Sequence, residues 1–79
     1  LVVKVSAKRY FLPSAMARFE SVVRELAARP PRGQFTAAEF RDRVGIGRNA
    51  VIEILEYFDR IGLTHRAGDL RTLLDVKRR

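Results

Sequence analysis

The sequence predicts one small α+β domain, mostly α, that is stabilised by side-chain packing. Its 79 residues allow a single hydrophobic core, and 47% hydrophobic with 32% charged residues is the composition of a globular chain. Apolar residues recur at helical steps in the middle of the chain, whereas short β-rich runs stand at both ends. There is no cysteine, so neither a disulfide nor a thiolate metal site supports the core.

The first twelve residues predict a β-hairpin. Residues 2–5 and 9–12 are rich in β-forming side chains, and a polar turn at residues 6–8 joins them. The chain begins in such a run without an initiator Met, so we expect it to be a piece of a longer protein. A two-stranded hairpin is marginal alone. We therefore expect residues 1–12 to belong with a preceding domain and to contribute little to the fold of the remainder.

Residues 14–28 predict the first helix, directly after Pro13. Its apolar residues follow the three- and four-residue steps of one helical face. They are Met16, Phe19, Val22, Val23 and Leu26. Pro30 and Pro31 stop the helix, and the RGQF that follows can add a short extended segment to a sheet.

TAAEF opens a second, short helix. Thr36 can cap its first turn, and Glu39, three residues on, can reach back to complete a capping box. We expect Phe40 and Val44 to face the core, and Gly45 to end the helix in the left-handed conformation.

A third helix is predicted over residues 48–61, after a tight turn at Ile46 and Gly47 and before a stop at Gly62. Its apolar face consists of Val51, Ile54, Leu55, Phe58 and Ile61. The opposite stripe consists of Asn49, Glu53, Glu56 and Arg60. Two of these four are acidic and would meet phosphates if the helix lay lengthwise in a DNA groove. Glu56 and Arg60 instead have the i, i+4 spacing of an ion pair.

The last predicted element is a β-hairpin, LTHR and LRTLL around the turn Ala67-Gly68-Asp69. Helix, short strand, helix, tight turn, helix and hairpin is the order of a winged helix, a helix-turn-helix core with a C-terminal wing. We expect this domain over residues 13–76 and a basic tail over residues 77–79.

The net charge of +7 and the pI near 11.1 indicate a polyanionic partner, most often nucleic acid. Residues 1–34 hold seven Lys and Arg against two Asp and Glu, and residues 62–79 hold five against two. Residues 35–61 hold four against five, so the middle helices are not a basic block. The alternative is that dispersed arginines only keep the domain soluble.

The tip of the third helix is a candidate anion site. Gly47 lets a backbone come close, Arg48 brings a charge, Asn49 offers donor and acceptor, and the first free N–H groups carry the positive end of the helix dipole. The arginines that can flank this tip are Arg41, Arg43, Arg66 and Arg71. The carboxylates with which any of them can pair instead are Asp42, Asp59 and Asp69.

Catalysis has little support in the sequence. There is one His, no Cys, no glycine-rich phosphate loop, and no converging carboxylates or metal ligands. His65 lies on the predicted wing, either as a phosphate contact or simply as a surface residue. We expect no membrane span and no signal peptide, and the lack of cysteine fits the reducing cytoplasm.

Residues 35–74 resemble the last winged-helix domain of the bacterial selenocysteine-specific translation elongation factors. FRDRVGIGR followed by ILEYFDRIGLTHR carries the resemblance. It implies binding of the selenocysteine insertion (SECIS) hairpin of the messenger RNA for UGA recoding. It also implies a parent protein with GTPase activity that binds GTP, selenocysteyl-tRNA and the ribosome, with no cofactor in this fragment. Residues 1–12 would then be the wing of a preceding winged helix.

In this family, the domain grips the RNA backbone and an extruded base with the tip of its helix-turn-helix. Asn49 stands where members often have Lys, which puts one phosphate contact in question. The expected RNA-binding residues are Arg43, Gly47, Arg48, Asn49, Arg66 and Arg71. The alternatives are a winged helix that binds double-stranded DNA as a transcription regulator, and a module that contacts only protein.

Overall fold

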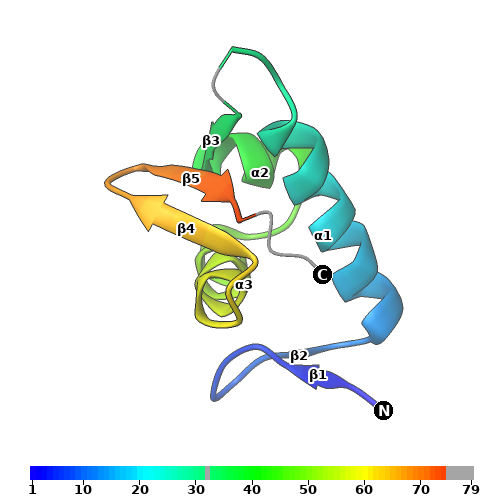
Figure 1. Cartoon of the computed structure of the whole chain (residues 1–79). Coiled ribbons are helices and arrows are strands. Elements are labelled where there is room, and N and C mark those ends of the chain that lie inside the picture. Colours follow the sequence, from blue (N-terminus) through cyan, green and yellow to red (C-terminus); the bar gives the residue numbers. More distant parts are fainter. Residues whose placement is uncertain (32, 75–79) are drawn as a thin grey trace.

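The computed structural model describes residues 1–31 and 33–74. Its helices are α1 (Pro13–Ala27), α2 (Ala37–Val44) and α3 (Arg48–Arg60). Its strands are β1 (Val3–Lys4), β2 (Tyr10–Phe11), β3 (Gln34–Thr36), β4 (Thr64–Ala67) and β5 (Leu70–Leu73). Three helices with a small antiparallel sheet confirm the winged-helix prediction (Figure 1). The predicted basic tail and residues 75–76 of the predicted domain lie outside the described residues.

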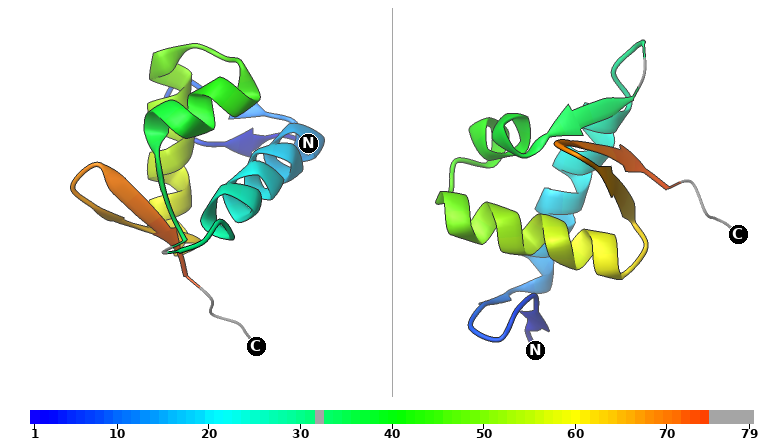
Figure 2. Two further views of the ribbon diagram at one scale, coloured as in Figure 1. Left: turned by 90° about the horizontal axis from the view of Figure 1, so that it is seen from above. Right: turned by 90° about the vertical axis from the view of Figure 1, so that its left-hand side faces the viewer.

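The three-stranded sheet has the order β3-β5-β4, so β5 is its central strand. Its register places Phe35 opposite Arg71 on one side and Arg66 opposite Arg71 on the other. The RGQF segment thus adds a strand to the sheet, as its extended character allows. Strands β4 and β5 form the wing, which projects to one side of the helices (Figure 2).

The core lies between α1, α2, α3 and the sheet. All five residues of the predicted apolar face of α1 are buried, and none is more than 8% exposed. The ring of Phe19 meets the ring of Phe40 edge-on, with centroids 6.2 Å apart. The helical spacing therefore predicted the buried side of α1 correctly. No described helix has the length and apolar composition needed to cross a membrane.

The two ends of α2 follow the predicted local chemistry. Thr36 Oγ1 accepts a hydrogen bond from the Glu39 N–H at 3.2 Å, and Glu39 Oε1 accepts one from the Thr36 N–H at 2.8 Å, which completes the capping box. Arg29 Nη2 lies 3.1 Å from the same carboxylate. Its hydrogen bond, with that from Thr36, lowers the pKa of Glu39. Gly45 ends the helix at φ 72°, as predicted.

Helix α3 buries four of its five predicted core residues, and the fifth prediction is wrong. Ile61 is 56% exposed. The helix ends at Arg60, and the N–H of Leu63 bonds to the Phe58 carbonyl at 2.9 Å across Gly62, which has φ 83°. This C-terminal turn brings Leu63, rather than Ile61, against the core. Ala50 is an additional buried residue of the helix.

The N-terminal hairpin shares the core of the helices. Its strands are shorter than predicted, with Val3 paired to Phe11. Val5 is fully buried within the same hydrophobic cluster, and the ring of Phe11 meets Phe19 edge-on at 5.3 Å. The structure thus differs from the expectation of a detached hairpin, because one of its sides is packed here. Its origin in a preceding domain stays a prediction.

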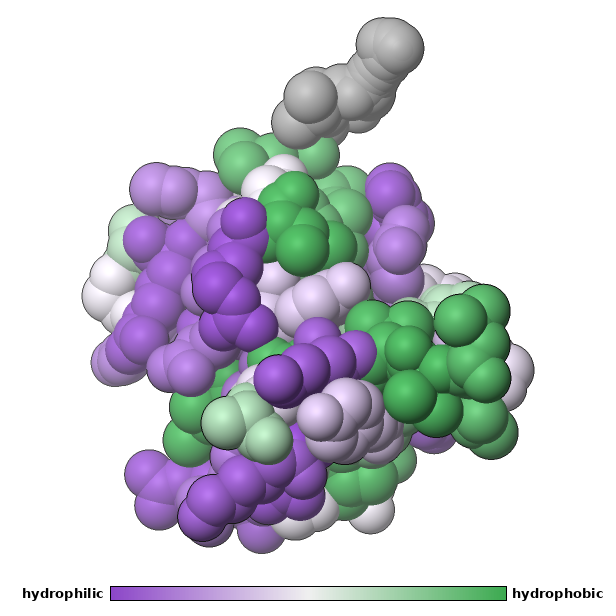
Figure 3. All heavy atoms as spheres, turned by 90° about the horizontal axis from the view of Figure 1, so that it is seen from below, coloured by the Kyte–Doolittle hydropathy of each residue, from purple (hydrophilic) through white to green (hydrophobic). Residues whose placement is uncertain are grey.

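The other side of this hairpin is exposed and carries several apolar side chains. Seen from below, the molecule shows hydrophobic surface on this underside (Figure 3). The exposed apolar residues of the hairpin are Leu1, Val2, Tyr10 and Leu12. The hairpin and the wing lie on opposite sides of α3 (Figures 1 and 2).

Candidate nucleic-acid interface

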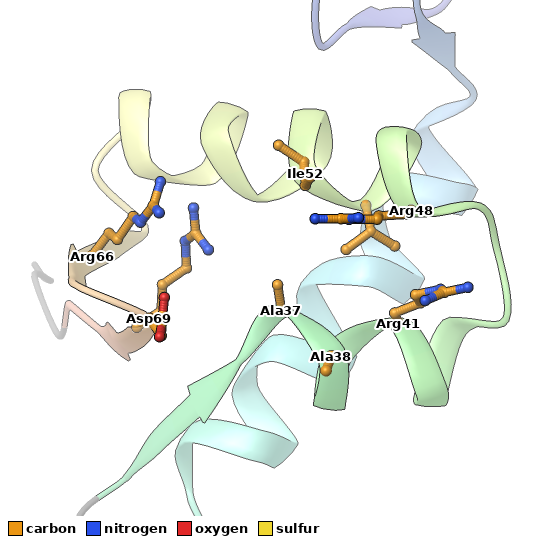
Figure 4. A pocket seen from close by; sticks show the side chains of 9 residues that line it. Ala37, Ala38, Arg41, Arg48, Ile52, Arg66 and Asp69 are labelled. Atoms are coloured by element: carbon orange, nitrogen blue, oxygen red, sulfur yellow. The ribbon is translucent and has the colours of Figure 1, made fainter.

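A surface groove of about 340 Å³ lies between the start of α2, the first turns of α3 and the wing (Figure 4). Its lining residues are Ala37, Ala38, Arg41, Arg48, Val51, Ile52, Arg66, Asp69 and Arg71. Four are arginines and one is an acid, while the rest are apolar. The groove is therefore a positively charged hollow with an apolar floor, which suits a polyanion that also has flat apolar parts.

The tip of α3 forms one end of this groove. Gly47 is its N-cap and makes no capping hydrogen bond with a side chain, and the first turn contains no acidic residue. The first N–H groups of the helix and its positive dipole end are thus left for a ligand. Within residues 1–31 and 33–74, neither Arg48 nor Asn49 has an ion pair or a side-chain hydrogen bond. The predicted anion site at the tip is therefore geometrically open.

The predicted arginines around the tip are not equivalent. Arg48 extends across the groove toward the wing, whereas the side chain of Arg41 points away from it (Figure 4). Arg66 donates from Nε to the Gly68 carbonyl at 2.9 Å and is exposed. Arg43 instead pairs with Glu25 of α1 at the surface. Arg48 and Arg66 thus face one ligand space from two elements.

Arg71 lies beneath this surface. It is 5% exposed, and its Nη2 lies 3.0 Å from Asp59 Oδ2. The alternative that an arginine pairs with Asp59 therefore applies to Arg71. Asp42 and Asp69, the other two carboxylates considered, form no ion pair in the described part of the chain.

The acidic stripe of α3 is partly covered by the N-terminal hairpin. Glu53 accepts a hydrogen bond from Ser6 Oγ, and Arg9 Nε lies 3.2 Å from its Oε1. The Ser6 hydrogen bond, followed by the Arg9 interaction, lowers the pKa of Glu53. This carboxylate is thus held by the hairpin, and Glu53 is not among the residues that line the groove. Its position agrees with the argument that α3 presents its tip, rather than its length, to a polyanion.

The predicted Glu56–Arg60 ion pair is absent from the described residues. Arg60 Nη2 instead donates to the Val5 carbonyl at 2.6 Å, and its guanidinium lies 5.8 Å from the centroid of the Tyr57 ring. The i, i+4 spacing permits the pair, but the hairpin offers Arg60 an acceptor that the helix sequence does not reveal.

Sequence reasoning missed part of the groove floor. Ala37, Ala38 and Ile52 lie outside the helical core stripes. Ile52 could have been noticed in the sequence, because it is a large apolar residue outside the predicted buried face of α3, and the structure leaves it 36% exposed.

His65 is exposed on β4, and it projects from the face opposite to that of its neighbour Arg66, away from the groove. No group of His, Cys, Asp and Glu that could hold a metal occurs among the described residues.

Comparisons with known proteins agree with the winged-helix fold. Residues 28–73 match the family model for the winged helix of elongation factor SelB. The chain is 40% identical over 76 residues to the selenocysteine-specific elongation factor of Escherichia coli, which covers 96% of this chain and 12% of that protein. It is 30% identical over 67 residues to the selenocysteine-specific elongation factor of Haemophilus influenzae, which covers 85% and 10%. The chain thus spans about a tenth of these relatives.

A solved structure gives the same result. The mRNA-binding domain of elongation factor SelB from Escherichia coli, in complex with SECIS RNA, superposes with a TM-score of 0.84 at 40% identity. The match covers 94% of this chain and 60% of that chain. Both the sequence and the fold therefore show that this chain belongs to the SelB elongation factor winged-helix family.

Proposed function

We propose that this domain binds the SECIS hairpin of a messenger RNA for recoding of UGA as selenocysteine. The observation that carries the proposal is the groove of arginines at the open tip of α3, which Glu53 does not line. The relative that is 40% identical and has the same fold is described in complex with SECIS RNA. The domain itself needs no cofactor and catalyses no reaction in this proposal.

The binding mode is mainly electrostatic. The contacts come from Gly47, Arg48 and Asn49 at the tip and from Arg66 on the wing, and the RNA backbone supplies the phosphates. A phosphate contact by Arg43 has to displace Glu25. The apolar floor, which includes Ile52, offers a surface on which a nucleobase can stack. A site for phosphate alone has no such surface.

The same proposal extends to the parent protein. We propose a cytoplasmic elongation factor that binds GTP and selenocysteyl-tRNA, hydrolyses GTP and acts on the ribosome. Support comes from the two selenocysteine-specific elongation factors, which this chain matches over about a tenth of their length.

A binding comparison tests the proposal. Fluorescence anisotropy is measured with a SECIS hairpin that has a looped-out base, and with a plain DNA duplex of equal length, at several salt concentrations. We expect the hairpin to bind more tightly, with a slope of roughly −2 to −4 in log affinity against log salt, since each contacted phosphate contributes about 0.7 to 0.9. Tighter binding of the duplex would favour the DNA-binding alternative, and a salt-independent affinity would exclude a phosphate-based mode.

A further inference from the structure

Among the described residues, one part-buried ion pair joins the wing to α3. Arg71 Nε lies 3.2 Å from both carboxylate oxygens of Asp59, and Nη2 lies 3.0 Å from Oδ2. The same carboxylate accepts a hydrogen bond from Thr64 Oγ1 at 2.5 Å. Thr64 begins β4 and is 1% exposed, and Arg71 lies on β5. A single side chain in the last turn of α3 thus holds both strands of the wing.

The strand register explains why this carboxylate is needed. Arg66 lies directly opposite Arg71 in the β4–β5 pairing. Directly opposed residues of antiparallel strands project from the same face, where two like charges repel each other. Asp59 offsets the charge of Arg71, and Arg66 bonds to the Gly68 carbonyl in the wing turn. The ion pair with Asp59 therefore allows a second arginine to occupy the groove side of the wing.

We propose that Asp59 and Arg71 are positioning residues, which set the affinity for RNA by fixing the wing, and with it Arg66, relative to Arg48 across the groove. The inference rests on the proposed function and gives Arg71 a role other than the RNA contact expected from sequence. With 5% of its surface exposed and two of its nitrogens bound to Asp59, Arg71 offers little to a phosphate. Arg48 and Arg66 are exposed on the two sides of the groove instead.

Variants at Asp59 and Arg71 test whether these residues position the wing or whether Arg71 contacts a phosphate directly. If Arg71 contacts a phosphate, Asp59→Asn releases its charge and strengthens binding. If Asp59 aligns the wing, the same variant weakens binding of the SECIS hairpin about three- to thirtyfold, as residues coupled through one network do. Arg71→Lys keeps the charge but loses the two-pronged geometry toward Asp59, so the positioning model expects it to weaken binding. Stronger binding by Asp59→Asn, or wild-type affinity of Arg71→Lys, overturns the proposal.

Salt dependence and a double-mutant cycle give readouts that a purely structural role does not move. Arg48→Ala, as the matched contact variant, reduces the magnitude of the salt slope by about 0.7 to 0.9, and Arg71→Lys reduces it by no more than this, because its effect passes through the single contact of Arg66. In an Arg66→Ala background, Asp59→Asn causes little further loss, because its effect passes through Arg66. An equal loss in both backgrounds contradicts the inference, as does a lower melting temperature with unchanged affinity.

The variant Thr64→Val and a measurement without RNA test the positioning role of Asp59 even if Asp59→Asn does not fold. Thr64→Val retains the shape and β-propensity of Thr64 and removes one hydrogen bond to Asp59, so the domain stays folded even where Asp59→Asn does not. We expect amide hydrogen exchange of β4 and β5 to quicken in this variant while that of α1 does not. Unchanged exchange in the wing overturns the positioning role. If the wild-type domain binds no SECIS hairpin, the proposed function fails, and the exchange result still decides whether Asp59 holds the wing.

Discussion

Two β-hairpins contact α3 from opposite sides, and they are attached in different ways. The wing is joined through a nearly buried ion pair, with side chains 6% and 25% exposed for Arg71 and Asp59. The N-terminal hairpin is joined through a more exposed pair, with 38% and 29% for Arg9 and Glu53, and through the fully buried Val5. Exposed ion pairs contribute little to stability, whereas burying a valine contributes about 1.5 to 3 kcal/mol.

The difference indicates how each attachment responds to its surroundings. The contact of the wing with α3 includes a charge pair that water reaches poorly, so this contact is geometrically strict and weakly screened by salt. The hairpin depends mainly on an apolar contact, to which its surface charges add orientation. We therefore expect the wing to be most sensitive to loss of a charge and the N-terminal hairpin to loss of a buried apolar side chain.

The largest effect is expected from breaking the wing attachment. Asp59→Ala leaves the guanidinium of Arg71 buried without its partner, which we expect to lower the free energy of unfolding by about 3 kcal/mol. Urea denaturation followed by circular dichroism measures it. The matched control Asp42→Ala, at an exposed carboxylate on α2, is expected to change it by less than about 0.5 kcal/mol. Equal effects of the two variants would show that Asp59 contributes no more to the free energy of unfolding than an exposed carboxylate does.

The next effect concerns RNA binding at the tip of α3. Arg48→Ala removes a charge-assisted hydrogen bond to phosphate, which costs about 1.5 to 3 kcal/mol or roughly ten- to a hundredfold in affinity. Glu53→Gln, on the hairpin side, is expected to change affinity far less and slightly upward. Both are measured on the same hairpin at one salt concentration. If Glu53→Gln costs as much as Arg48→Ala, the carboxylate contacts a base and the tip-only binding mode is wrong.

Val5→Ala tests whether the N-terminal hairpin shares the core. The lost methyl groups and the remaining cavity are expected to lower the free energy of unfolding by roughly 1 to 2 kcal/mol. Val2→Ala is the control, because Val2 is 52% exposed on the other side of the hairpin. Thermal unfolding compares the two. An unchanged melting temperature for Val5→Ala would support the expectation that residues 1–12 contribute little to this domain.

The smallest effect is the pH dependence of the hairpin contact. The Ser6 hydrogen bond and Arg9 lower the pKa of Glu53 below its ordinary value of 4.5. Its contribution to stability is therefore fully present above that value and is lost as the pH falls through the lowered pKa. We expect the melting temperatures of the wild type and Glu53→Gln to differ slightly at neutral pH and to converge in acid. A difference that grows in acid would contradict the assignment.

Local signals in the sequence predicted most of the fold. The capping box of Thr36 and Glu39 and the left-handed Gly45 depend on residues within one helical turn, so their chemistry is visible in the sequence. Ile61 was mispredicted because periodicity continues through a helix end, while the turn at Gly62 changes which side chain meets the core.

Long-range contacts explain what the sequence left open in the site. The tip of α3 was predictable, since a glycine followed by Arg48 is a local arrangement. Whether Arg71 reaches solvent or Asp59 depends on how the wing packs on α3, and both outcomes were compatible with the sequence. Likewise, the contact between Ser6 and Glu53 joins residues 47 positions apart. No spacing rule indicates such a pair.

The hydrogen bond from Arg60 to the Val5 carbonyl restricts the sequence of the N-terminal hairpin only weakly. Its acceptor is a main-chain atom, which every amino acid provides at that position. Polar substitutions in the turn of the hairpin therefore leave this bond intact, provided that the backbone keeps its path and residue 5 stays apolar. A chimera that carries the corresponding segment of a relative should retain the joint between this segment and α3, so the segment can diverge or be grafted without redesign of the helix.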